Sequence, residues 1–433
     1  MIADNTAAEA GQPKSWGMTH TSQQFDRGPG LWVTDTEPAS VDAPKLRAGR
    51  LTRLRTMMRD KDYDALVLFD PFNQRYATGS RNMFGYFLRN STRYFFIPTE
   101  GPVILFEYPQ SAHVSACLET VQEVRNSRIV WSSVGGRDAE TARPFAEEIA
   151  DLIREFGRGS RKVGLDRCGH LLALALEAQG CTVTDCQQEI LHVRRLKSAE
   201  EIACLKLSMA ATEFAVAAVR DNVRPGVAEQ ELFAAMYGEV IRHGGEFVET
   251  RLLTSGPRTN PWFSEASGRR VRPGELVALD TDTIGCFGYY SDFSRTFHCG
   301  PGRPTAYQKL LYRHAYDQIQ HNIGIIRPGI SYRELAQQAW KIPERFVERR
   351  YTSVLHGVGM HGESPFVAHS QDFAKFGGEG VLEPGMVVSV ESYIGDVNGP
   401  EGVKLEEELL VTADGTELIT RFPFEESLLG REL

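Results

Sequence analysis

The sequence predicts an α/β protein of two globular domains, and three observations support this. Short apolar strands alternate with amphipathic helices over residues 45–194, as in an α/β domain. Ser198 and Glu201 form a capping box that begins a long helix, so a second domain is expected over residues 195–433. Within it, an Arg-Pro-Gly turn follows each of two long helices. This repeat predicts two similar halves that leave one site between them.

The first domain is expected to contain short buried strands joined by tight turns. The segments that indicate strands are "DALVLFD", "YFFIPT" and "GPVILFEY", followed further on by "KVGLDR" and "CTVTDC". Between them, "AEEIADLIREFG" has the spacing of an amphipathic helix that ends at a glycine. Residues 1–44 are rich in Gly, Pro, Ser, Thr and Asp and predict an extended arm, in which Trp16, Phe25 and Trp32 could pack on a neighbouring surface.

Composition excludes several classes of function. The formal charge is −9, from 48 basic and 57 acidic residues, without a Lys/Arg-rich stripe, so nucleic acid is not an expected partner. The sequence has neither a secretory signal nor a run of about 18 apolar residues, which predicts no membrane span. The seven cysteines are odd in number and form no C-x-x-C pair, so neither a disulfide framework nor a thiolate zinc site is expected. A cytoplasmic location follows as the expectation.

The internal repeat pairs two segments of the second domain. "VRPGVAEQEL" at 223–232 and "IRPGISYREL" at 326–335 each follow a long helix and keep a Glu-Leu pair at the same offset. Arg-Pro-Gly is a common turn, so chance is one explanation. The shared order of helix, turn, helix and strands favours an internal pseudo-twofold duplication.

Three aspartates are expected to lie close together in the second domain. "LVALD" reads as a strand, Ile284–Tyr290 as a glycine-containing turn, and "YSDFSRTF" as the returning strand of a hairpin. Asp280 and Asp282 then share a face, and Asp292 returns beside them. A single Asp near glycine is usually a turn or cap residue, but three carboxylates in apolar strands repel one another unless a cation neutralises them.

Two glutamates and a histidine extend this set. Glu391 and Glu406 lie in otherwise apolar strands, where an unpaired carboxylate is costly. Glu407 and Glu408 follow directly, so a solvated charge run is the alternative. With His356, these oxygen and nitrogen donors suit two divalent metal ions, such as Mn, Fe, Co or Zn, with Fe as the first expectation.

The glycines around His356 also spell G-x-G-x-x-G, the pattern of a dinucleotide loop. That loop must follow a strand and begin a helix. Here "HGVGMHGESPFVAHSQDF" continues into proline and polar residues without helical spacing, so the metal interpretation is favoured.

These residues resemble the pita-bread superfamily of methionine aminopeptidase, aminopeptidase P, prolidase and creatinase. The likeness covers the second domain as the catalytic domain and, more loosely, the first as a creatinase-type N-terminal domain. The superfamily signature Asp, Asp, His, Glu, Glu occurs here in "LDTDT", "SDFSRTF", "HGVG", "SVESYI" and "VKLEEE". In the peptidases the two aspartates lie eleven positions apart, whereas eleven before Asp292 is Thr281, flanked by Asp280 and Asp282.

That Asp-Thr-Asp variant is similar to the DddP-type lyases of marine bacteria, which cleave dimethylsulfoniopropionate (DMSP) to dimethyl sulfide and acrylate. The resemblance implies a small zwitterionic substrate, a homodimer, a substrate-binding role for Tyr351 and six metal ligands. Trp262 is a second aromatic residue whose face could hold the sulfonium. The six ligands would be Asp280, Asp282, Asp292, His356, Glu391 and Glu406.

One position departs from the lyases, which carry an aspartate as catalytic base six residues after the metal histidine. Here that position is Gly362. The base would then be His361, Glu363 or a hydroxide held by the metal. Three hypotheses remain: a DMSP lyase, an Xaa-Pro peptidase or amidohydrolase of the same fold in which His361 stabilises an oxyanion, and a member that binds ligands without catalysis.

Overall fold

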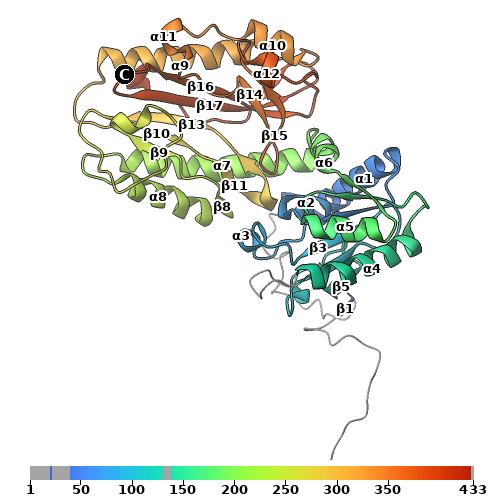
Figure 1. Cartoon of the computed structure of the whole chain (residues 1–433). Helices are drawn as coiled ribbons and strands as arrows, with labels where there is room; N and C mark the ends of the chain where they lie inside the picture. The colour runs from blue at the N-terminus through green and yellow to red at the C-terminus, as the bar shows by residue number, and fades with distance from the viewer. Residues whose placement is uncertain (1–19, 22–39, 130–137, 431–433) are drawn as a thin grey trace, which may run out of the picture. The chain divides into compact units, whose positions relative to one another are not determined.

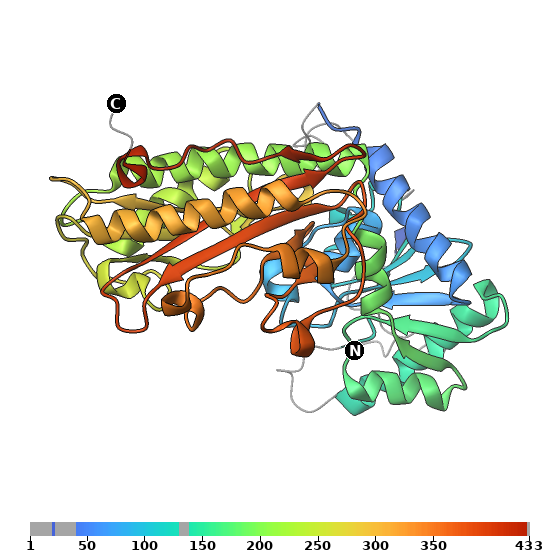
Figure 2. The same ribbon diagram turned by 90° about the horizontal axis from the view of Figure 1, so that it is seen from above.

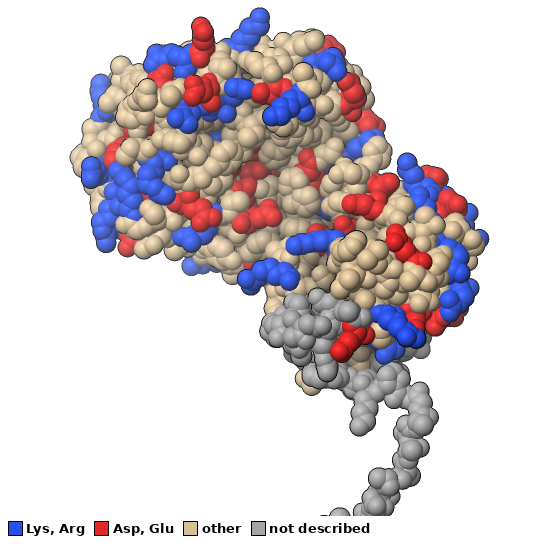
Figure 3. All heavy atoms as spheres, in the orientation of Figure 1, with Lys and Arg blue, Asp and Glu red and all other residues tan. Residues whose placement is uncertain are grey.

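The computed structural model describes residues 20–21, 40–129 and 138–430. The chain falls into two units, Met1–Val193 and Arg194–Leu433, each considered by itself (Figure 1). On the face drawn in Figure 3, basic and acidic side chains are interspersed in both units.

In the described part of the first unit, one mixed sheet runs in the order β1-β5-β4-β3-β2-β6-β7. The central strands β2, β3 and β4 pair antiparallel, whereas β2 pairs parallel with β6 and β6 with β7. Every residue of β2, β3 and β4 is buried, as expected for apolar runs with both sheet faces covered. The strand bounds are β1 His20–Thr21, β2 Ala65–Leu68, β3 Tyr94–Pro98, β4 Ile104–Glu107, β5 Glu123–Asn126, β6 Lys162–Leu165 and β7 Thr182–Asp185.

Helices of the first unit begin at the positions that side-chain caps favour. Asp42 caps α1, and Asp70 caps α2 by accepting from two backbone N–H groups. Phe145 and Ile149 of α4 pack into the core beside the sheet. The helix bounds are α1 Ala43–Asp60, α2 Pro71–Thr78, α3 Phe84–Phe87, α4 Asp138–Phe156, α5 His170–Ala178 and α6 Gln187–Arg194.

The arm predicted for residues 1–44 is described only in part. His20–Thr21 pairs antiparallel with β5 and so extends the sheet. Trp16, Phe25 and Trp32 lie outside the described residues.

Two halves of the second unit repeat the same local structure, as the Arg-Pro-Gly segments predict. Gly226 follows α7 (Ala199–Asn222) and has φ +88°, and Gly329 follows α9 (Ala306–Ile325) and has φ +82°. Glycine suits this left-handed backbone because it lacks a Cβ. The two glycine N–H groups donate to Val271 O at 2.8 Å and to Leu382 O at 2.7 Å. The next helices are α8 Glu229–Arg242 and α10 Tyr332–Gln338.

The strands of the second unit lie between α7 and α8 on one side and α9 and α10 on the other (Figures 1 and 2). Their sheets have the orders β13-β10-β9, β12-β11-β8 and β15-β14-β16-β17-β18. The core between α9 and the long strands β16 and β17 is apolar. The strand bounds are β8 Phe247–Val248, β9 Leu253–Ser255, β10 Leu276–Asp280, β11 Thr283–Ile284, β12 Tyr290–Ser291, β13 Ser294–His298, β14 Leu355–Val358, β15 Gly362–Val367, β16 Val387–Gly395, β17 Gly402–Val411 and β18 Thr416–Leu418. The short helices are α11 Glu344–Val347, α12 Phe373–Phe376 and α13 Glu426–Leu429.

The sequence predicted no segment able to span a membrane, and helix α7 is an exception by length and composition. An 18-residue stretch of α7 has a mean hydropathy of 1.6, enough by length and composition to cross a membrane. Half of that stretch is buried within the fold, where Leu205, Met209 and Val216 are fully covered. Its apolar composition therefore serves core packing in this unit.

Candidate metal centre

The three aspartates come from one excursion between β10 and β13. These strands pair antiparallel, with Asp280 opposite Ser294, and the chain between them forms the second pair β11 and β12. The expected continuous hairpin is therefore broken into two pairs. The break lies at Thr281 and Asp282, where Asp282 adopts φ +38°.

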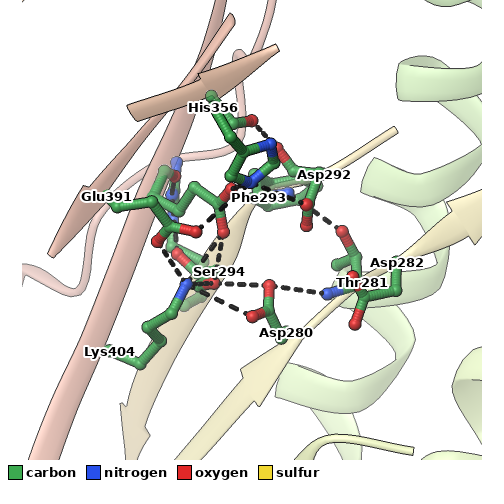
Figure 4. Close-up of polar contacts among 12 residues, drawn as sticks. Asp280, Thr281, Asp282, Asp292, Phe293, Ser294, His356, Glu391 and Lys404 are labelled. Atoms are coloured by element: carbon green, nitrogen blue, oxygen red, sulfur yellow. Dashed lines mark hydrogen bonds and ion pairs between the residues drawn. The ribbon is translucent and has the colours of Figure 1, made fainter. Parts of the chain in front are cut away.

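Two glutamates face the histidine from neighbouring strands. Glu391 on β16 lies directly opposite Glu406 on β17, and His356 on β14 lies opposite Ser389 of β16. The Nε2 atom of His356 is 3.5 Å from Asp292 Oδ2, 3.4 Å from Glu391 Oε1 and 3.5 Å from Glu406 Oε1 (Figure 4). Ligand atoms of Asp292, His356 and Glu406 lie within 4.8 Å of one another.

The His356 ring is oriented to offer a lone pair to these carboxylates. Its Nδ1 lies 3.1 Å from the carbonyl oxygen of Gly357, which can only accept a hydrogen bond. Nδ1 therefore donates, and in the neutral imidazole Nε2 carries the lone pair. A backbone carbonyl that fixes the tautomer in this way is typical of metal-binding histidines.

Several carboxylate oxygens near His356 are buried without a hydrogen-bond donor. Among the residues that the structure describes, the candidate ligands contribute Asp292 Oδ1, Glu391 Oε1 and Glu406 Oε1, and the neighbouring Glu408 Oε1 is a fourth such oxygen. Buried carboxylate oxygens are costly without a donor or a cation. A divalent ion that accepts oxygen and imidazole ligands fits this donor set.

Asp280 and Asp282 differ from the other ligand candidates because their oxygens already accept hydrogen bonds. Asp280 Oδ1 accepts from Ser294 Oγ at 2.6 Å and from the Thr281 N–H at 3.1 Å. Asp282 is turned toward Thr250 and Tyr290, whose hydroxyls donate to its two oxygens. Asp282 therefore lies at the edge of the cluster (Figure 4).

Lys404 lies within the carboxylate cluster and was not identified from the sequence. Its Nζ is 2.6 Å from Glu391 Oε2, 2.9 Å from Glu406 Oε2 and 3.2 Å from Asp280 Oδ2, and the side chain is fully buried. Strand alternation could have revealed it, because Lys404 and Glu406 are two positions apart on β17. With all five candidate carboxylates ionised, this one ammonium would leave an excess of four negative charges, which two divalent cations would balance.

The acid–base behaviour reflects this crowding. Burial and the neighbouring Glu406 raise the pKa of Asp292 well above its usual range. Burial also disfavours charge on Glu406, but Lys404 and His356 outweigh it and lower the Glu406 pKa. Burial opposes charge on His356, but Glu391 and Glu406 raise the His356 pKa well above its usual value. A divalent ion among these groups would favour ionised carboxylates and a neutral imidazole.

Glu407 and Glu408 are buried, so a solvated charge run does not describe them. Glu408 Oε2 accepts the Asp292 N–H at 3.1 Å and so supports a candidate ligand. Glu407 points to the opposite face, where it pairs with the buried Arg295 at 2.5 Å. The alternation predicted for Glu406 to Glu408 matches these directions.

Glu363, proposed from the sequence as a candidate base, has a structural role. Its fully buried carboxylate pairs with Arg194 and with Lys197, whose Nζ is 3.4 Å away, and accepts the Met360 N–H at 2.9 Å. Burial opposes its charge, but Arg194 and Lys197 lower the Glu363 pKa to about 2. A carboxylate held in this way is a poor proton acceptor near neutral pH.

The remaining candidates lie around the same strands. His361 is half-buried in the turn between β14 and β15, and its Nδ1 contacts the Gly362 carbonyl. Because that carbonyl accepts, His361 Nε2 carries the lone pair. The rings of Tyr351 and Trp262 face Lys404, with Nζ 4.5 Å and 6.0 Å from their centroids. The ring faces of Tyr351 and Trp262 therefore contact the ammonium group of Lys404. The sequence predicted that they contact the substrate.

Replacing Glu363 with glutamine is expected to lower the free energy of unfolding of the second unit by about 3 to 5 kcal/mol. The substitution leaves Arg194 and Lys197 buried without their counter-charge. Denaturant unfolding followed by tryptophan fluorescence measures the change. The control is Glu417→Gln, whose partner Lys206 is exposed, and it should cost less than about 1 kcal/mol.

The pH dependence gives a second check on Glu363. Its pKa is lowered to about 2 from an ordinary 4.5, so its stabilisation is present above 4.5 and is lost as the pH falls toward 2. The stability difference between the wild type and Glu363→Gln should therefore shrink over that window. A difference that stays constant down to pH 2 would contradict the ion-pair role.

Comparison with known families identifies the fold. Residues 203–413 match the family model "Metallopeptidase family M24", and residues 50–196 match "Creatinase/Prolidase N-terminal domain". A protein from Roseovarius nubinhibens named dimethylsulfoniopropionate lyase DddP is 34% identical over 408 residues, covering 93% of this chain and 91% of that protein. The chain belongs to metallopeptidase family M24.

Further similarities also extend along most of the chain. A second dimethylsulfoniopropionate lyase DddP, from Roseobacter denitrificans, is 32% identical and covers 93% of this chain and 92% of that protein. Among solved structures, an Xaa-Pro dipeptidase from Bacillus anthracis superimposes with a TM-score of 0.70 at 22% identity, covering 88% of this chain and 99% of that one. A prolidase from Pyrococcus horikoshii gives 0.69 at 21% identity, covering 87% and 99%. These structures support the pita-bread fold, and the family places this chain among metal-dependent enzymes.

Proposed function

We propose that this M24 protein is a metal-dependent lyase that cleaves DMSP to dimethyl sulfide and acrylate. The observation that carries this is its similarity to two DMSP lyases along 93% of the chain. The carboxylate cluster beside His356 supports it, because buried oxygens without donors fit a divalent ion. We propose Asp280, Asp282, Asp292, His356, Glu391 and Glu406 as the ligands.

The chemistry is a β-elimination from a small zwitterion. A bound divalent ion would polarise the substrate carboxylate and acidify the adjacent C–H bond. The base removes that proton, the C–H electron pair forms the double bond of acrylate, and the C–S pair leaves with dimethyl sulfide. Around this site, Lys404 holds Glu406, and Glu408 holds the Asp292 backbone, so the donors are fixed before substrate arrives.

We assign the base to His361. Its Nε2 carries the lone pair because Nδ1 contacts the Gly362 carbonyl, and an imidazole is suited to accept protons near neutral pH. The ion pairs of Glu363 with Arg194 and Lys197 favour His361 over Glu363 in this role.

The substrate sulfonium needs an aromatic surface other than the faces that Lys404 covers. Phe263 is 56% exposed, and its ring centroid lies 5.5 Å from that of Tyr351. We propose that Phe263 contacts the sulfonium by cation–π attraction, with Tyr351 behind it and Trp262 supporting Lys404.

Incubation of the metal-loaded protein with DMSP is expected to release acrylate and dimethyl sulfide in equal amounts. Headspace detection of dimethyl sulfide and chromatography of acrylate measure the two products. Heat-denatured protein and protein treated with chelator serve as controls. Absence of both products with Fe, Mn, Zn and Co would reject the lyase function.

Hydrolysis of Xaa-Pro dipeptides is the second candidate. The observation that favours it is Gly362, six residues after His356. The DddP-type lyases described above carry their aspartate base at this position, and glycine cannot act as a base. In this reaction, His361 would stabilise an oxyanion. Release of proline from Xaa-Pro dipeptides, without release of acrylate from DMSP, would favour the hydrolase.

Three further assignments complete the proposal. We propose iron as the resident metal, a homodimer as the oligomeric state and the cytoplasm as the location. Elemental analysis of protein purified without added metal tests the iron assignment. Size-exclusion chromatography with light scattering tests the homodimer, and cell fractionation tests the location.

A further inference from the structure

The carboxylate cluster has a His356 end and a Lys404 end, and the two ends differ in whether the carboxylate oxygens have hydrogen-bond donors. At the His356 end, Asp292 Oδ1, Glu391 Oε1 and Glu406 Oε1 have no hydrogen-bond donor. His356 Nε2 lies 3.4 to 3.5 Å from all three side chains. A cation placed here does not compete with a lysine ammonium or a hydroxyl for these three oxygens, and it can take the lone pair of the neutral His356 imidazole.

At the other end, every oxygen already faces a donor. Lys404 Nζ lies 2.6 Å from Glu391 Oε2, 2.9 Å from Glu406 Oε2 and 3.2 Å from Asp280 Oδ2. Ser294 Oγ donates to Asp280 Oδ1 or Glu406 Oε2, at 2.6 and 2.8 Å. A cation placed here must compete with an ammonium for the same oxygens.

The ammonium cannot retreat to water without a large rearrangement. The Lys404 side chain is fully buried, and the rings of Tyr351 and Trp262 cover Nζ at 4.5 Å and 6.0 Å. A divalent ion at this end therefore meets a buried positive charge within a few ångströms, and such repulsion is only weakly screened.

We propose that Lys404 makes the two ends of the cluster unequal. The first divalent ion binds at the His356 end, and a second ion binds at the Lys404 end only in competition with the ammonium. Lys404 is thus a positioning residue that sets metal stoichiometry when metal is scarce. Metal binding is measured without substrate, so the result is independent of the reaction proposed above.

Titration of the metal-free full-length protein with Mn²⁺ tests this asymmetry. Calorimetry gives the affinity of each equivalent, and electron paramagnetic resonance separates an isolated Mn²⁺ from a coupled pair. In the wild type, the second equivalent should bind about tenfold or more weaker than the first. Lys404→Met keeps an unbranched side chain one atom shorter and removes its charge, so it should tighten the second equivalent by about tenfold or more and the first by less.

Two controls separate charge from general perturbation. Lys404→Arg keeps the positive charge and should preserve the unequal affinities. Lys206→Met removes an exposed ammonium that pairs with Glu417 and should behave as the wild type. Equal affinities in the wild type, or an unchanged ratio in Lys404→Met, would overturn the proposal. Equal wild-type affinities would overturn the proposal even if Lys404→Met fails to fold.

Discussion

Replacing His356 with alanine is expected to abolish tight binding of the first metal ion and to reduce turnover by about 10³-fold or more. His356 contributes the imidazole lone pair, and Asp292, Glu391 and Glu406 present their unpaired oxygens around it. A bound metal supplies several kcal/mol of charge stabilisation in such reactions, which corresponds to about 10³ in rate. Metal content after dialysis and the rate of acrylate release measure the two effects.

The matched control is His321→Ala. His321 is exposed, and its ring contacts the Gln338 carbonyl, so its removal should leave metal content and rate unchanged. If His356→Ala retained both, the metal centre would have to lie elsewhere. Loss of activity with full metal content would instead indicate that His356 acts on the substrate.

The fold could be predicted from the sequence because its signals are local. The Arg-Pro-Gly turns require a left-handed glycine after each long helix, and Gly226 and Gly329 both adopt it. Apolar runs such as "DALVLFD" are too short for helices and became buried strands. The sequence prediction of no membrane span rests on the absence of an uninterrupted apolar run. That criterion misses α7, a core helix whose mean hydropathy is nevertheless high enough for a membrane span.

The candidate site could be predicted only in part because its electrostatics depend on partners distant in sequence. The ligand types followed from carboxylates in apolar strands. Lys404 was overlooked, since a lysine beside three glutamates reads as surface charge until strand pairing places Glu391 beside it. The ion pairs of Glu363 could not be foreseen, because its partners Arg194 and Lys197 lie more than 160 positions earlier. Asp282 was placed with Asp280 by alternation, which fails where the backbone leaves the strand.

Gly362 is a position where a base can be added without disturbing the backbone. Gly362 is exposed at the start of β15. Its φ is not positive, so its backbone conformation is open to residues other than glycine. A Cβ built there has one heavy atom within 4 Å, His356 Nδ1 at 3.9 Å. A side chain at 362 therefore begins in open space beside His356, the proposed metal ligand.

Gly362→Asp is expected to increase acrylate release from DMSP by about 10²-fold to 10⁴-fold, the usual gain from a positioned general base. Gly362→Asn has the same shape and accepts no proton, so it separates basicity from sterics, while Gly362→Ala measures the Cβ alone. Steady-state acrylate release compares all four proteins. An aspartate variant no faster than the asparagine variant would mean that position 362 does not reach the proton, and that His361 remains the base for whichever substrate this site accepts.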